Sequence, residues 1–137
     1  MEPVEITLWR RYEIEAAHQL TDGVPEGHRC RRLHGHRYVV HVGIRGRIRP
    51  NGMLIEYADL DTQVWPILKR CDHYSLNTLS ERHSGPLADA CSANPTVELL
   101  CAWLVDALGF LRNPTALFQL AGVRIEEDSR ASVEWLA

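Results

Sequence analysis

The chain has 137 residues, a length typical of one domain with a modest hydrophobic core. Its 45% hydrophobic and 24% charged residues are ordinary for a soluble globular protein, and no apolar run reaches the roughly 18 residues of a membrane span. A net charge of -3 argues against a nucleic-acid-binding protein. The N-terminal stretch lacks the apolar segment of a signal peptide, so we expect a cytoplasmic protein with reduced cysteines.

Alternating apolar residues predict two strands in the first third of the chain, at about 6–18 and 34–44. In both, the even-numbered positions form the apolar face. A loop rich in glycine and proline separates them. A helix is predicted next, at about 57–70. Pro66 lies inside this segment, so either the helix is kinked there or it begins later.

The second half of the chain begins with a predicted loop at 80–93. A helix follows at 94–109, where Asn94 suits the N-cap, Pro95 the first helical position and Gly109 the C-terminal end.

Two short strands, at about 121–127 and 131–136, are predicted to end the chain. The resulting order, strand–strand–helix–helix–strand–strand, favours an α+β fold with a four-stranded antiparallel sheet and both helices packed on one face. A sheet of this size has two open edges, so we expect an oligomer.

Three histidines end the apolar faces of the first two strands. His18 ends the first, while His34 and His36 begin the second and, being two residues apart, point the same way. Polar groups at such positions destabilise a fold unless they find partners. Three neutral imidazoles with one open coordination position are the ligand set of a catalytic zinc site. The alternative interpretation is that these side chains bond to backbone or water.

Other reactive side chains surround this cluster in the sequence. Cys30 is interpretable as a fourth ligand, as a reactive thiolate or as an inert small residue. Asp72 and His73 form an acid–imidazole pair if the backbone turns there, and histidine carries protons readily near neutral pH. Glu127 shares the parity of the inward-facing residues on its predicted strand.

Arginine is concentrated in one region of the chain. Seven of the fourteen arginines lie between Arg29 and Arg49. The arginine fork suits phosphate oxygens, so a local anion site is one interpretation. A solvated face is the other.

Six short motifs occur in order with compatible spacing. They are EAAH at 15–18, CRRLHGH at 30–36, GM at 52–53, DHYSLN at 72–77, NPTVE at 94–98 and VRIEE at 123–127. Together they resemble the 6-pyruvoyltetrahydropterin synthase superfamily, and within it the bacterial 6-carboxy-5,6,7,8-tetrahydropterin synthases of queuosine biosynthesis. The AAH ending and the three-residue gap between Cys30 and His34 favour this branch.

The resemblance implies the tunnelling fold (T-fold), in which three subunits join their sheets into a barrel and two trimers stack. It implies a lyase that converts 7,8-dihydroneopterin triphosphate to 6-carboxytetrahydropterin, releasing acetaldehyde and triphosphate. The implied cofactor is Zn²⁺, bound by His18, His34 and His36. The implied catalytic residues are Cys30 as the base, His73 oriented by Asp72, and Glu127. The implied substrate-binding residues are Glu127, Thr96 and Glu98.

Three alternative functions remain open from the sequence. One is a 6-pyruvoyltetrahydropterin synthase, and another is a non-catalytic relative that binds pterin or metal. The third is a three-histidine zinc hydrolase, which would leave Cys30 and Glu127 without a role. Relatives often have threonine directly after the carboxylate that corresponds to Glu127, whereas this chain has Asp128. Glu126, Glu127 and Asp128 are therefore all candidates to face the pterin, and strand parity favours Glu127.

Overall fold

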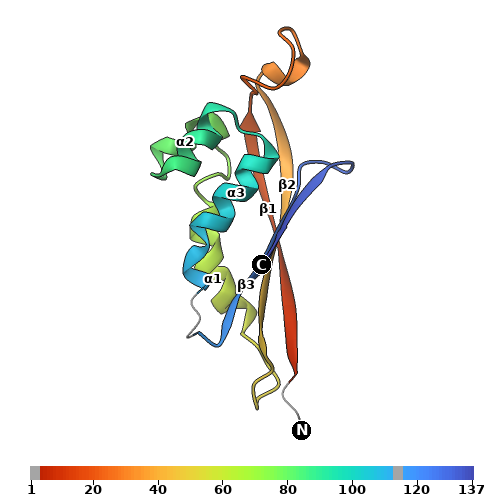
Figure 1. Ribbon diagram of the computed structural model, residues 1–137, viewed down its shortest axis with the longest axis vertical. Coiled ribbons are helices and arrows are strands. Elements are labelled where there is room, and N and C mark those ends of the chain that lie inside the picture. The colour runs from red at the N-terminus through yellow and green to blue at the C-terminus, as the bar shows by residue number, and fades with distance from the viewer. Residues whose placement is uncertain (1–3, 113–115) are drawn as a thin grey trace.

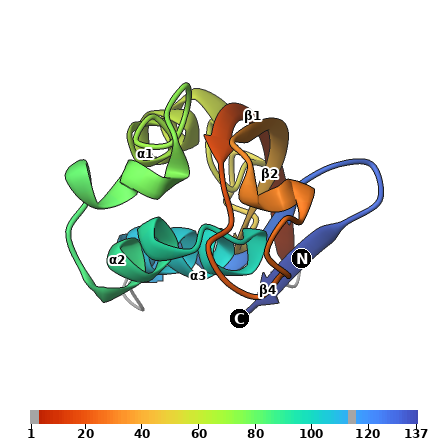
Figure 2. The ribbon, with the colours of Figure 1, turned by 90° about the horizontal axis from the view of Figure 1, so that it is seen from above.

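The computed structural model describes residues 4–112 and 116–137. One antiparallel sheet has the strand order β1-β2-β3-β4, and the helices lie against one of its faces (Figures 1 and 2). The predicted α+β arrangement is therefore confirmed. The strands are β1 Glu5–His18, β2 His34–Arg47, β3 Phe118–Glu126 and β4 Ser132–Leu136. The α-helices are α1 Tyr57–Leu68, α2 Pro86–Ala93 and α3 Val97–Ala107, and the 3-10 helices are η1 Arg29–Arg31, η2 Leu76–Glu81 and η3 Gly109–Arg112.

The core lies between the sheet and the helices. On β2 the even-numbered residues from 38 to 44 are fully buried, as the period-two pattern predicts. Leu60 and Val64 of α1 and Leu104 of α3 pack into the same core. The apolar face thus holds β1 and β2 in one register, because a slip of one residue would turn every buried side chain outward.

Helix α1 begins at Tyr57, so the alternative of a later start is wrong. The Glu56 carboxylate accepts a hydrogen bond from the backbone N–H of Asp59 and caps the helix. Pro66 lies in the last turn, where losing a backbone donor disturbs few of the helix's hydrogen bonds.

The prediction of a loop over 80–93 is wrong. Helix α2 occupies most of it, with Pro86 in its first turn and Ala88 and Cys91 buried. The prediction of Asn94 as the N-cap of the next helix is also wrong, because Asn94 ends α2 and the Thr96 hydroxyl caps α3 by accepting from the N–H of Leu99.

The opposite face of the sheet carries no helix in residues 4–112 and 116–137 (Figure 2). Trp9 lies across Gly43 and Gly122 there, where an added Cβ would meet the indole ring at 2.9 Å and 2.6 Å. Strands β1 and β4 are the two edges of the sheet. In the part of the chain that is described, no helix combines the length and apolar character needed to span a bilayer.

Candidate metal centre and active site

The pairing of β1 with β2 brings the three predicted histidines together. His18 lies directly opposite His34, and His36 lies opposite Ala16. Opposed residues of antiparallel strands point to the same face. The ring centroid of His18 lies 4.5 Å from that of His34 and 5.1 Å from that of His36. The ring centroids of His34 and His36 are 5.0 Å apart. One ligand nitrogen from each lies within 4.8 Å of the others. We call these residues the three-histidine cluster.

Backbone carbonyls fix the orientation of two of these rings. Nδ1 of His18 lies 2.6 Å from the carbonyl oxygen of Pro95, and Nδ1 of His34 lies 2.7 Å from that of Arg32. A carbonyl oxygen only accepts, so each Nδ1 carries the hydrogen and donates. The lone pair of each ring is then on Nε2, as in metal-binding histidines whose second nitrogen donates to a carbonyl.

The cluster fits a zinc ion by two further observations. His18 is 2% exposed, and its Nε2 is buried without a hydrogen-bond partner among the described residues. Burial lowers the pKa of His18 below its ordinary value, and the neighbouring imidazoles add to this, while the hydrogen bond to Pro95 opposes it. His18 is therefore neutral near pH 7, as a metal ligand must be, and an unpartnered buried nitrogen is satisfied by a metal ion.

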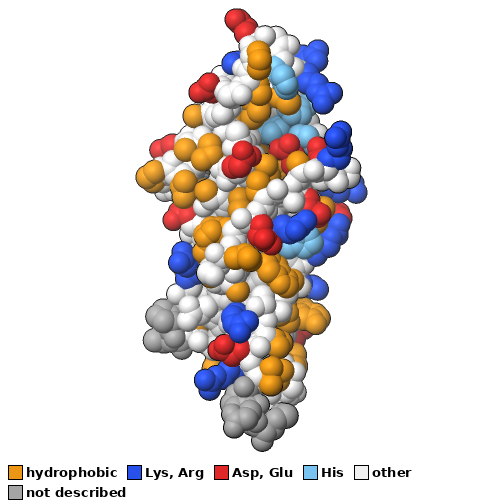
Figure 3. Space-filling view, turned by 45° about the vertical axis from the view of Figure 1, so that its right-hand side comes forward, with side chains coloured by type: hydrophobic (Ala, Val, Ile, Leu, Met, Phe, Trp, Pro, Cys, Tyr) orange, Lys and Arg blue, Asp and Glu red, His pale blue; other side chains and the backbone are white. Residues whose placement is uncertain are grey.

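Cys30 lies in η1, at the end of the sheet that carries the cluster. Its carbonyl accepts from the N–H of Leu20, two residues beyond His18, at 2.8 Å. Its own N–H donates to Nδ1 of His28. Its side chain is partly exposed, and the group of side chains able to share a metal ion does not include it. Figure 3 shows histidine side chains near one end of the molecule, beside Lys or Arg side chains.

Two of the arginines near Cys30 form hydrogen bonds or ion pairs within the chain. Arg31 donates to the carbonyls of Thr21 and Val24 at 2.8 Å and 2.7 Å, and so braces the loop before Cys30. Arg37 pairs with Glu15 at 2.9 Å. Both guanidinium groups are thus already bonded to groups of the chain itself.

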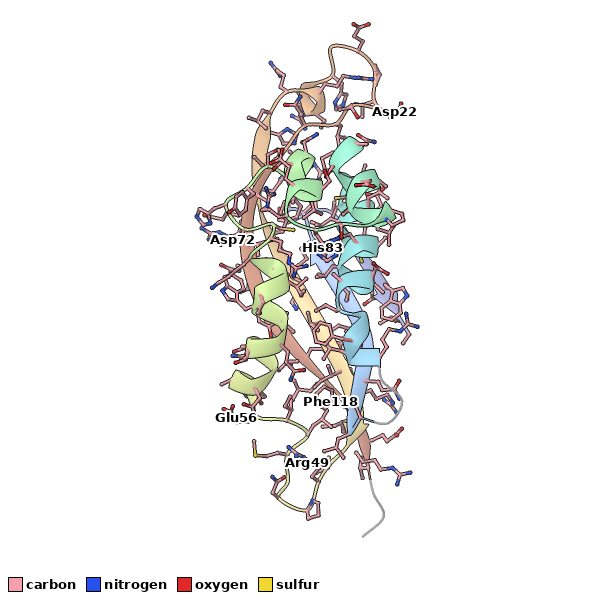
Figure 4. All side chains as sticks on the ribbon, turned by 90° about the vertical axis from the view of Figure 1, so that its left-hand side faces the viewer. Asp22, Arg49, Glu56, Asp72, His83 and Phe118 are labelled. Atoms are coloured by element: carbon pink, nitrogen blue, oxygen red, sulfur yellow. The ribbon has the colours of Figure 1, made fainter. Side chains whose placement is uncertain are left out.

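Asp72 and His73 form the predicted acid–imidazole pair at the outer edge of β1. Nδ1 of His73 lies 3.0 Å from the Asp72 carboxylate, and its Nε2 lies 3.7 Å from that of Glu15. The His73 side chain is 74% exposed and lines the same shallow depression as His36. Figure 4 shows Asp72 near the end of α1. No hydrogen bond or ion pair joins His73 to Cys30 within the described residues.

The three acidic residues at the end of β3 have separate environments. Glu126 pairs with His41 at 3.2 Å, on the face away from the helices. Asp128 accepts two backbone hydrogen bonds in the turn to β4, which lower its pKa. Glu127 is partly buried, and its charge adds to the effect of burial in raising the pKa of Tyr38. Of the three acidic residues, Glu127 is thus the one whose charge acts on the buried Tyr38 phenol.

Comparisons of the sequence with known proteins identify the family of the chain. The sequence model of the family described as 6-pyruvoyl tetrahydropterin synthase matches residues 7–136. The chain belongs to this family. It is 32% identical over 107 residues, 74% of this chain and 73% of the relative, to a Synechocystis protein named 6-carboxy-5,6,7,8-tetrahydropterin synthase. An Archaeoglobus fulgidus protein provisionally given the same name is 31% identical over 64 residues, which span 47% of this chain and 56% of that protein.

The structural comparison shows a likeness of fold over the whole chain. A Caenorhabditis elegans 6-pyruvoyl tetrahydropterin synthase structure has a TM-score of 0.79 and 24% identity, covering 100% of this chain and 99% of that one. The α+β T-fold assignment is therefore confirmed at the level of the subunit.

Besides Glu127, the resemblance implies substrate binding for Thr96 and Glu98, which lie at the start of α3. The Thr96 Oγ1 accepts from the backbone of Leu99, and Glu98 is exposed in the first turn. Glu98 lines a shallow hollow with Cys101 and Trp135, between α3 and β4. The structure therefore gives Thr96 a capping role in addition to the role that the resemblance implies.

Sequence reasoning missed Tyr38 as part of this site. Its side chain is fully buried, its ring stands edge-on to His36 at 5.5 Å, and its hydroxyl lies 3.4 Å from Nδ1 of His18. The signal was present, because Tyr38 continues the even-numbered series of His34 and His36. A phenol on that face must lie beside the imidazoles.

Proposed function

We propose that this protein is a zinc-dependent 6-carboxy-5,6,7,8-tetrahydropterin synthase acting on 7,8-dihydroneopterin triphosphate, a step toward queuosine and related 7-deazapurines. The observation that carries the proposal is the convergence of three imidazoles in a chain of the pterin synthase family. The name of the Synechocystis relative, 32% identical over 74% of the chain, supports the carboxy product.

Zn²⁺ is the cofactor that the three-histidine cluster would hold. The Nε2 atoms of His18 and His34 are its natural ligands, since both Nδ1 atoms donate to carbonyls. When bound, zinc supplies a Lewis acid for the hydroxyl groups of the substrate side chain. Tyr38 packs behind the cluster and, being fully buried, keeps water from that side.

Cys30 is the proposed base that removes a proton from the substrate side chain. Cys30 is partly exposed, as a base that meets a substrate has to be. The cap from His28 and the bond to Leu20 hold its backbone in place. The bracing by Arg31 holds the loop before it, so the thiol is presented by an ordered segment.

His73 is the proposed second proton carrier. The Asp72 carboxylate, 3.0 Å from Nδ1, favours the tautomer with the hydrogen on Nδ1, so that Nε2 is free to accept a proton. Its 74% exposure lets it reach a substrate lying over the depression that His36 also lines.

Pterin recognition is assigned to Glu127, Thr96 and Glu98. A carboxylate accepts two hydrogen bonds side by side, which suits the guanidine-like edge of a pterin. The partial burial of Glu127 and the effect of its charge on the buried Tyr38 support this role. Because Thr96 Oγ1 already accepts from Leu99, its hydroxyl hydrogen is free to be donated to the ligand.

The open sheet edges support assembly into a homo-oligomer, a trimer or a dimer of trimers. Residues 72–77 cover β1 only near its C-terminal end, through the bridge of Ala17 with Ser75 and the amide of Asn77 bonded to Gln19. The remaining length of β1 and the outer edge of β4 carry backbone groups able to pair with another copy.

Product analysis tests the proposal. Purified protein with zinc and 7,8-dihydroneopterin triphosphate is expected to yield 6-carboxytetrahydropterin and acetaldehyde. A 6-pyruvoyl product would move the chain to the sister activity. Tight pterin binding without turnover would indicate a non-catalytic relative.

A Cys30→Ala variant separates the roles of the thiol. Loss of turnover with zinc retained supports base catalysis, because the sulfur is then not needed to hold the metal. Loss of zinc would make Cys30 a ligand, and full turnover of the pterin substrate would show that Cys30 is not the base. Cys101→Ala is the control, since Cys101 is buried and packs against β3.

A further inference from the structure

The turn that carries His73 has a backbone conformation that needs support. His73 has a φ of 62°, and it is the only non-glycine residue with positive φ in residues 4–112 and 116–137. A non-glycine residue in this left-handed backbone conformation raises the free energy of the fold. The conformation persists only where the contacts around it hold it in place. The contacts of the neighbouring residues therefore decide where the His73 imidazole points.

Strand β1 holds one side of this turn. The N–H of His73 donates to the carbonyl of Glu15 at 2.6 Å, and the N–H of Glu15 donates to the Asp72 carboxylate at 2.9 Å. The N–H of Ala17 donates to the carbonyl of Tyr74 at 3.0 Å. These bonds attach one side of the turn to the sheet edge, and the N–H of Tyr74 closes the turn itself by donating to the carbonyl of Cys71 at 3.1 Å. The other side of the turn faces away from β1.

Arg82 holds that other side. Its Nε donates to the carbonyl of Arg70 at 2.8 Å, and its Nη2 donates to that of Ser75 at 3.4 Å. Nη1 donates to the hydroxyl of Thr78 at 3.0 Å. The guanidinium carbon lies 3.7 Å from the centre of the Tyr74 ring, a stacked arrangement. One side chain thus joins the backbone before His73 to the backbone after it.

We propose that Arg82 is a positioning residue for the reaction, holding the strained turn so that the His73 imidazole meets the substrate. This inference rests on the proposed function. None of the Arg82 contacts in the described chain reaches the His73 ring or the three-histidine cluster, so Arg82 acts through the backbone. A planar fork bonded to three acceptors is required, which lysine supplies only in part.

The test compares Arg82→Gln with Arg82→Lys and with Arg112→Gln, a matched loss of an arginine stacked on an aromatic ring, Trp135, at 5.2 Å. We expect Arg82→Gln to lower kcat at least tenfold with a smaller change in KM, Arg82→Lys to recover part of the loss, and Arg112→Gln to retain wild-type kcat. In a His73→Asn background, Arg82→Gln should cause no further loss. A wild-type kcat in folded Arg82→Gln, or the same loss without the imidazole, would overturn the proposal.

NMR gives a readout that does not depend on activity. The ring resonance of His73, identified by its absence in His73→Asn, is expected to move in both Arg82 variants and to stay in place in Arg112→Gln. If Arg82→Gln does not fold, Arg82→Lys carries this test. An unmoved resonance contradicts the positioning role, whereas a moved resonance in a protein inactive on the pterin contradicts the proposed function alone.

Discussion

Removal of the metal should lower the stability of the fold by an amount that the structure lets us estimate. In metal-free protein the Nε2 of His18 is buried without a partner, a situation that costs about 1–3 kcal/mol. Zinc at a hundredfold excess over its Kd stabilises the folded state by about 2.7 kcal/mol. For a domain of this size, 1 kcal/mol moves Tm by about 4 °C, so we expect a shift of about 10 °C.

Thermal unfolding at a fixed protein concentration measures this shift, with zinc and with a chelator. His34→Ala should abolish the zinc-dependent shift, because it removes one of three ligands. His41→Ala should retain it, since His41 pairs with Glu126 on the opposite face of the sheet. Equal Tm values with and without zinc in the wild type, or a full shift in His34→Ala, would refute the reasoning.

Two further predictions concern pH and helix capping. Because burial lowers the pKa of His18 in the folded state, the unfolded chain binds the proton first as the pH falls below about 6.5. The free energy of unfolding of metal-free protein, from urea titrations, should therefore decline below that pH, and His18→Gln should decline less; equal declines would contradict this. Thr96→Ala should lower stability by about 1 kcal/mol in the same assay, and Thr96→Ser should not; an unchanged Thr96→Ala would show that the cap is dispensable.

The three-histidine cluster could be predicted because strand parity is a local property. His34 and His36 must share a face, and His18 ends an apolar face of the same kind. No local pattern in the sequence predicts the strand register that places His18 opposite His34. Burying both apolar faces in one core requires the three histidines to share a face, and the observed register brings them together as predicted.

Other features depend on contacts between distant segments and could not be predicted. Helix α2 is eight residues long and consists mostly of small residues, so its apolar stripe is too short for a periodic signal. Asn94 was a plausible cap, but its side chain instead bonds to the backbone of Thr21 and Asp22. The left-handed conformation of His73 is held by backbone bonds to Glu15 of β1, which lies far from it in the sequence.

The measurement that tests the account most directly is anomalous diffraction at the zinc edge from crystals of the zinc-loaded protein. We expect one peak per chain, bonded at about 2.0–2.1 Å to one nitrogen each of His18, His34 and His36, with Nε2 as the ligand atom of the first two. A peak at another position, bonding through Nδ1 of His18, or no peak in fully folded protein would contradict it.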